Sequence, residues 1–237
     1  LRSLAMLAGY KQGWDIVAQV CDFAIVPKTF KEFYDKSFEC SQVDIKEVNG
    51  YWVNSLRSKE RFARGYPVYG RTDYAEKVKN VVNSTRVAAH MGLWRGYTDD
   101  EAGKSGFFEF VRMESYSANP LSMIPISFAN LAVRREAVPA TYCIKNSDTL
   151  AGVLLQILAK HKGERVTFGK PTVRLTAWPN ERYSTAPTLL TNKVNDRIWR
   201  VMDTDTSPKE SYLSLCKKVA ESTQIAGLSY WLSLFED

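Results

Sequence analysis

The stretch SDTLAGVLLQILAKHKGERVTFGKPTVRLTAW, residues 147–178, decides the fold class. Its first half is apolar at helical spacing, begins with Ser147-Asp148 and ends in cations and Gly163, as a capped helix does. Its second half alternates apolar and polar residues around Gly169, which predicts a β-hairpin or two strands joined by a tight loop. Helices that flank short, mostly antiparallel strand groups without regular βαβ alternation predict an α+β fold.

Further helices are predicted from helical spacing and cap signals. The most explicit case opens at Asp73, where Glu76 follows three residues later as in a capping box. That helix would run to about Met91 and carry an outer polar face formed by Lys79, Asn83, Arg86 and His90. The other predicted helices cover 3–26, 29–38, 128–133, 208–221 and 223–235.

Strands are predicted where β-branched and aromatic residues alternate with polar ones. The run 43–48 ends at Asn49-Gly50, a dipeptide typical of hairpin turns, so 51–53 is predicted as its return strand. Two more strands are predicted at 107–113 and 197–202. The apolar, proline-containing stretch 115–140 is interpreted as a long connection packed on the core.

The domain organisation follows from length and the absence of repeats. At 237 residues the chain suits a single α+β domain over 1–237. The alternative divides it near residue 140, into a basic and aromatic half, 1–140, and a helix–hairpin–helix half, 141–237.

The cysteines and histidines argue against a zinc site. Four cysteines lie far apart, and the two histidines, His90 and His161, do not complete a close-paired ligand set. We therefore expect reduced core cysteines and no cofactor. No apolar run reaches the roughly 20 residues that span a bilayer, and no signal peptide is seen. These features predict an intracellular protein of a reducing compartment that does not contact a membrane.

Charge is the most informative functional signal. The chain has a net charge of +6 and a pI near 9.0. Between residues 51 and 98, nine basic residues stand against three acidic ones, so this segment carries an excess equal to that of the whole chain. Eight aromatic residues are interleaved with these charges. Basic and aromatic side chains in one segment favour, as the partner, a polyanion whose nucleobases can stack.

The leading hypothesis is a non-catalytic protein that binds single-stranded nucleic acid, RNA before DNA, as a packaging or accessory component. Guanidinium and ammonium groups would bind phosphates, and tyrosine rings would stack on bases. The predicted site comprises Arg57, Lys59, Arg61, Arg64, Tyr66, Tyr69, Arg71, Lys79 and Arg86. A weaker basic set, Arg134-Arg135 with Arg197 and Arg200 around Trp199, would extend it.

Two alternatives remain open at this point. The first is a structural assembly subunit, homo- or hetero-oligomeric, with the aromatic C-terminal helix and 115–140 as protein interfaces. The second is a metal-dependent enzyme acting on phosphate, in which Asp203 and Asp205 would hold a magnesium ion after a strand. No nucleophile elbow, Walker loop or dinucleotide fingerprint accompanies them, so we expect no catalysis.

Overall fold

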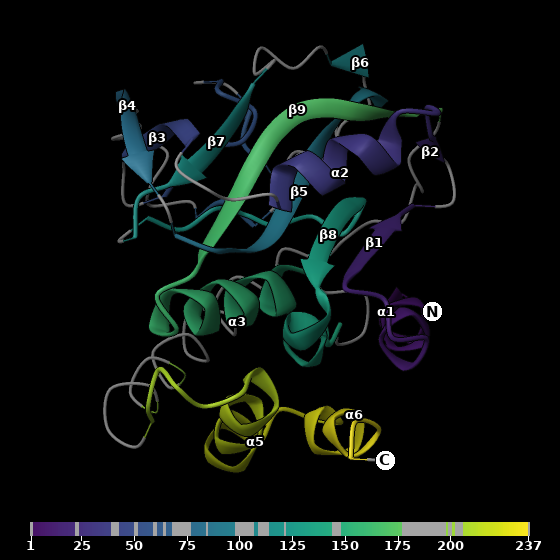
Figure 1. Ribbon diagram of the computed structural model, residues 1–237, viewed down its shortest axis with the longest axis vertical. Coiled ribbons are helices and arrows are strands. Elements are labelled where there is room, and N and C mark those ends of the chain that lie inside the picture. The colour runs from purple at the N-terminus through teal and green to yellow at the C-terminus, as the bar shows by residue number, and fades with distance from the viewer. Residues whose placement is uncertain are drawn as a thin grey trace.

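A computed structural model describes residues 2–21, 24–38, 43–49, 52–58, 61–63, 65–67, 77–83, 85–97, 107–108, 114–120, 122–143, 148–176, 198, 201 and 206–236. Through these residues runs one mixed sheet of nine strands, in the order β1-β8-β5-β9-β7-β3-β4, with β2 on β9 and β6 on β5. Helix α2 lies in front of this sheet, and α3, α5 and α6 lie below it (Figure 1). The α+β class is confirmed, although two strand pairs are parallel.

The centre of the sheet is a parallel pair of long strands, β5 (Val87–Tyr97) and β9 (Arg165–Leu175). Both are buried over most of their length, and Leu93 and Phe168 are fully inaccessible. β5 is largely apolar, as strands covered on two faces typically are, whereas β9 carries polar and charged residues between its apolar ones. The two central strands lie far apart in sequence, so long-range pairing holds the centre of the sheet together.

The predicted hairpin around Gly169 is wrong, because β9 continues through this position as one strand. Gly169 and Lys170 both adopt positive φ, 125° and 44°, and the pairing with β5 shifts register beside them. A Cβ on Gly169 would lie 2.2 Å from the Glu114 carbonyl oxygen. The tight-loop signal therefore marks a bulge, where an extra residue bends a strand without reversing it.

The predicted helix over 73–91 is also wrong, since the chain forms β4 (Lys77–Asn83) and then β5. β4 pairs antiparallel with β3 (Val43–Asn49). The valines of this stretch sit at spacings that suit a helix, but β-branched side chains also favour a pleated surface. The pairing of β4 with β3, and of β5 with β8 and β9, selects the strand over the helix.

At the N-terminal side, the predicted helix over 3–26 is only partly correct. α1 (Arg2–Lys11) ends before Gly13, which has a φ of 75°. The chain then forms β1 (Ile16–Val20), with alternating burial, and β2 (Ala24–Ile25). The left-handed glycine ends the helix and turns the chain into the sheet. The next prediction, a helix at 29–38, is confirmed by α2 (Phe30–Phe38).

The middle of the chain contains strands where a connection was predicted. β7 (Ser115–Ala118) pairs with β3 and β9, and β8 (Asn130–Arg134) pairs with β1 and β5. The short helix predicted at 128–133 is therefore wrong, and a 3-10 helix, η2 (Arg135–Thr141), follows instead. The hairpin at Asn49-Gly50 is wrong as well, because β3 pairs with β4 and Trp52 bridges Met123. β6 (Phe107–Phe108) is the described part of the strand predicted at 107–113.

The C-terminal helices are present with shifted boundaries. α3 (Asp148–His161) matches its prediction, and α5 (Tyr212–Thr223) begins four residues later than predicted. The Oγ of Ser211 caps α5 by accepting from the Ser214 N–H, while the Glu210–Ser207 contacts of the capping box form on the turn before it. α6 (Leu228–Ser233) is the shorter final helix. Ile198 and Val201 are helical, so the strand predicted at 197–202 is wrong.

Most buried residues form one core cluster between the sheet and the lower helices, and a smaller cluster lies under α2. Cys216 is a buried free thiol, Cys21 and Cys143 are half-buried, and Cys40 lies outside the described residues. Among the described helices, none is both long and apolar enough to cross a membrane.

Candidate anion-binding pocket

The sequence-predicted site is only partly described. Lys59, Arg64, Tyr69 and Arg71 lie outside the described residues. Arg57 is exposed and Arg61 is half-buried. Tyr66 is a correction: its side chain is only 2% exposed and packs 4.8 Å from the Phe62 ring, so it offers no face to a base.

Two predicted phosphate contacts are engaged by carboxylates. The Lys79 Nζ lies 3.2 Å from Oε1 of Glu47, which is buried between strands. Arg86 forms ion pairs with both Glu136 and Glu164, the latter at 3.1 Å. Lys79 lies on β4 and Arg86 just before β5, and not on one helix face, so the predicted basic stripe does not exist. A phosphate would have to displace carboxylates that already satisfy these cations.

His90 is a core residue and not a phosphate contact. It is completely buried on β5, where its Nδ1 lies 2.7 Å from the Thr167 hydroxyl and its ring meets those of Phe33 and Tyr34 edge to face. Burial lowers the pKa of His90 to about 3, because charging it there would require desolvating an imidazolium. The imidazole is therefore neutral near pH 7.

The weaker basic set is structural where it is described. Arg134 donates to the carbonyls of Val87 and Phe38, and Arg135 donates to the Tyr10 carbonyl while its guanidinium lies 4.6 Å from that ring. Arg197, Trp199 and Arg200 lie outside the described residues, as do Asp203 and Asp205. Within the part of the chain that is described, no cluster of metal-ligating side chains occurs.

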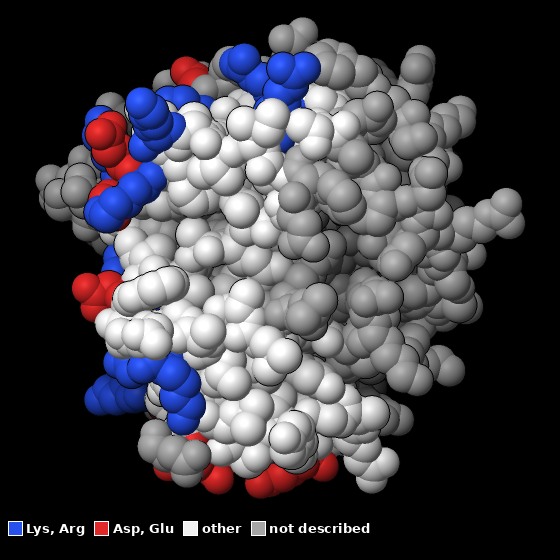
Figure 2. Space-filling model, turned by 90° about the vertical axis from the view of Figure 1, so that its right-hand side faces the viewer, with Lys and Arg blue, Asp and Glu red and all other residues white. Residues whose placement is uncertain are grey.

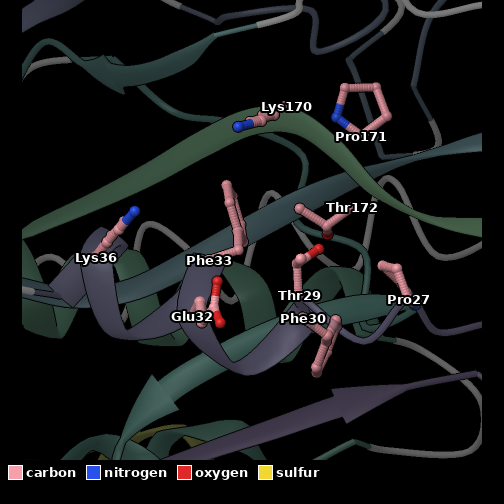
Figure 3. Close-up of a pocket in the computed structure, with 9 residues that line it drawn as sticks. All are labelled: Pro27, Thr29, Phe30, Glu32, Phe33, Lys36, Lys170, Pro171 and Thr172. Carbon is pink, nitrogen blue, oxygen red and sulfur yellow. The ribbon is translucent and has the colours of Figure 1, made fainter.

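A pocket of about 220 Å³ lies between α2 and the bulged part of β9 (Figure 3). The α2 side contributes a helix face and the residues just before it, and β9 contributes the three residues after Gly169. The bulge therefore makes the pocket, since it bends β9 where α2 crosses it. The lining residues are Pro27, Thr29, Phe30, Glu32, Phe33, Lys36, Lys170, Pro171 and Thr172.

The side chains of this pocket are sorted by chemistry along its length. Figure 3 shows the nitrogen atoms of Lys36 and Lys170 toward one end and the rings of Pro27 and Pro171 toward the other. Phe33 points from α2 toward β9 between these ends, and its ring lies 5.7 Å from the Lys170 Nζ. The pocket is thus cationic at one end and apolar at the other.

A buried polar network supports the wall formed by β9. The Tyr34 hydroxyl donates to Oδ1 of Asn130 at 2.5 Å, and Nδ2 of Asn130 donates to the Thr172 hydroxyl at 2.7 Å. Burial raises the pKa of Tyr34, so it remains a neutral donor. A Cβ on Gly92 would lie within 2.7 Å of all three side chains, so only glycine leaves room for this network. These contacts fix Thr172 before any ligand arrives.

Two arginines continue the cationic surface beyond the pocket. Arg95 of β5 and Arg174 of β9 are paired in parallel register, and both are exposed while their neighbours Trp94 and Val173 are buried. Arg174 lies two residues after Thr172 on the same strand. The described ion pairs involve neither these arginines nor the pocket lysines. We call Lys36, Lys170, Arg174 and Arg95 the α2-face cations.

Sequence reasoning placed none of these four cations in the predicted site, although Arg95 lies in the basic segment. Lys36 and Lys170 lie outside the basic segment, and Arg174 belonged to a strand whose partner could not be read from sequence. The one available signal was Gly169-Lys170-Pro171, interpreted as a loop. Comparison with protein-family models and with curated proteins found no match to this chain.

Proposed function

We propose that this chain binds single-stranded nucleic acid, RNA in the first instance, without catalysing a reaction on it. The observation that carries the proposal is the set of α2-face cations: four basic side chains from α2, β5 and β9, engaged by no described carboxylate. Cations without an internal partner are free to replace counterions along a phosphate backbone. The excess of basic residues in 51–98, to which Arg95 belongs, supports the same partner.

The geometry also favours a single strand over a duplex. The cations surround a pocket with an aromatic wall, and bases can enter such a pocket only when they are not paired. Backbone charge with aromatic contact gives binding that tolerates many sequences. This is the behaviour of a packaging or accessory protein.

The test is fluorescence anisotropy with a labelled single-stranded RNA over a salt series. We compare the wild type with an Arg95→Gln/Arg174→Gln variant. The matched control is Lys209→Gln/Lys217→Gln, which removes the same charge beyond the sheet, on and just before α5. The arginine variant should bind at least tenfold more weakly, with a salt slope lower by about 0.7 per lost contact. Equal losses in both variants, or affinity indifferent to salt, would contradict the proposal.

A second candidate function, an assembly subunit, rests on exposed apolar side chains. Trp14 after α1 is 57% exposed and Tyr230 on α6 is 72% exposed. Figure 2 shows a broad uncharged area on the side of the molecule that it faces, with described charges near its margin. The stretch 115–140 supports this candidate less, because Phe128 and its neighbours are buried. Light scattering that gives a monomer at all concentrations, without nucleic acid, would contradict this candidate.

A further inference from the structure

The α2–β9 pocket has the polarity of a site for part of one nucleotide. Its volume of about 220 Å³ lies below the range of roughly 300–1,000 Å³ for sites that enclose a drug-sized ligand. It therefore holds one nucleotide only in part, while the rest of a strand would remain outside. Arg174 and Arg95 are exposed neighbours in parallel register beyond Thr172 and can hold the adjoining phosphates.

We propose that this pocket binds a single nucleotide of the strand, with its phosphate at the Lys36–Lys170 end and its base against Phe33 and the two prolines. This inference rests on the proposed function, which it deepens by assigning a subsite. Among the described residues that line the pocket, only Lys36 and Lys170 carry cationic groups. They lie at the end away from the prolines, so the charge separation of a nucleotide matches that of the pocket (Figure 3).

Phe33 is held as a platform before the base arrives. Its ring is half-buried and contacts the rings of His90 at 5.1 Å and Tyr34 at 5.2 Å, edge to face in both cases. These contacts restrict its rotation on the side of the sheet. An ordered ring loses little conformational entropy when a base packs against it, which favours binding.

The remaining polar groups predict which bases fit best. The hydroxyl oxygens of Thr29 and Thr172 face each other across the pocket, and Thr172 is fixed by Asn130 (Figure 3). Glu32 adds one carboxylate, which can accept a hydrogen bond but cannot donate one when ionised. A carboxylate accepts from the exocyclic amino group of cytosine, and uracil has none. The pocket should therefore prefer cytidine to uridine nucleotides.

The test is isothermal titration of the full chain with cytidine 5′-monophosphate, beside uridine 5′-monophosphate, cytidine and inorganic phosphate. Lys36→Met and Lys170→Asn should each weaken the binding of cytidine 5′-monophosphate about tenfold, because each removes one charge-assisted contact. Asparagine is chosen at 170 because it tolerates the positive φ there. Lys31→Met is the matched control, since Lys31 lies on the same helix but pairs with Asp35 outside the pocket.

The outcomes separate this inference from the proposed function. Binding of cytidine 5′-monophosphate that both pocket variants weaken and the control retains supports the subsite. Glu32→Gln should then reduce the preference over uridine 5′-monophosphate. No mononucleotide binding at millimolar concentration, or equal affinity in all variants, overturns the subsite even if single-stranded RNA still binds. Mononucleotide binding without RNA binding overturns the proposed function instead.

Discussion

The basic residues of the 51–98 segment and the α2-face cations differ in what surrounds them. In the segment, Lys79 and Arg86 meet Glu47, Glu136 and Glu164. On the α2 face, the four cations come from three elements far apart in sequence and meet no described acid. A charged segment in a sequence shows how many basic residues are present, but not whether they are already paired. A binding surface needs cations that no neighbouring carboxylate already satisfies.

The largest effect should come from acid, through the buried histidine beneath α2. The native pKa of His90, about 3, lies below the value of about 6.5 for an unfolded histidine, so only the unfolded state binds its proton between these values. Stability from this group is complete above pH 6.5 and is lost as the pH falls toward 3, by about 5 kcal/mol. Denaturant unfolding at a series of pH values measures this.

The control for this prediction is His90→Gln, which keeps a polar side chain but removes the titration. Its free energy of unfolding should be lower at pH 7 and should fall less steeply below pH 6.5. The acidic side chains of the chain titrate in both proteins, so only the difference between the two curves reports on His90. Parallel curves would show that His90 is not buried in its neutral form beneath α2.

The next largest effect should come from filling the space that the Tyr34–Asn130–Thr172 network occupies. In Gly92→Ala, the new Cβ would lie 2.5–2.7 Å from polar atoms of all three residues. We expect a loss of about 3 kcal/mol of unfolding free energy, from overpacking together with broken buried hydrogen bonds. Gly13→Ala is the control: its φ of 75° is unfavourable for alanine, unlike that of Gly92, but no atom lies near its Cβ, so about 1 kcal/mol should be lost. Similar losses in both variants would contradict the packing argument.

Arg86→Gln separates the two regions most directly. Glu164 is largely buried and receives hydrogen bonds from both Arg86 and the Tyr212 hydroxyl, the latter at 2.7 Å. Removing the guanidinium leaves this carboxylate with one charge-assisted partner fewer, so stability should fall by about 2 kcal/mol. Affinity for single-stranded RNA should not change, in contrast to Arg95→Gln/Arg174→Gln. Thermal unfolding measures the stability and anisotropy measures the RNA affinity, both on the same preparation. A loss of RNA binding without a loss of stability would show that Arg86 serves binding and not the fold.

Local signals in the sequence located some elements correctly but not the sheet. α2 and α3 were predictable because their apolar spacing and boundary residues agree with the packing they reach. β4 and β5 were not, because valines at 78, 81 and 82 fit a helix as well as a strand, and only pairing with β3, β8 and β9 decides. The pocket was unpredictable for the same reason. Lys36 and Lys170 meet only because β9 passes under α2, and neither lies near the other in sequence.

The smallest effect should be a gain in stability, at the residue where bulge and binding coincide. Lys170 has a φ of 44°, which a lysine adopts at a cost and a glycine without one. Lys170→Gly should therefore raise the free energy of unfolding by up to about 1 kcal/mol, offset in part by the greater freedom of glycine in the unfolded chain. It also removes the cation above Phe33, so affinity for RNA should fall. If the role of Lys170 were structural, its substitution would lower the free energy of unfolding. If Lys170 serves binding and its backbone is strained, its substitution should lower the affinity for RNA and raise the free energy of unfolding. Denaturation and anisotropy measured on the same variant distinguish a structural from a binding role.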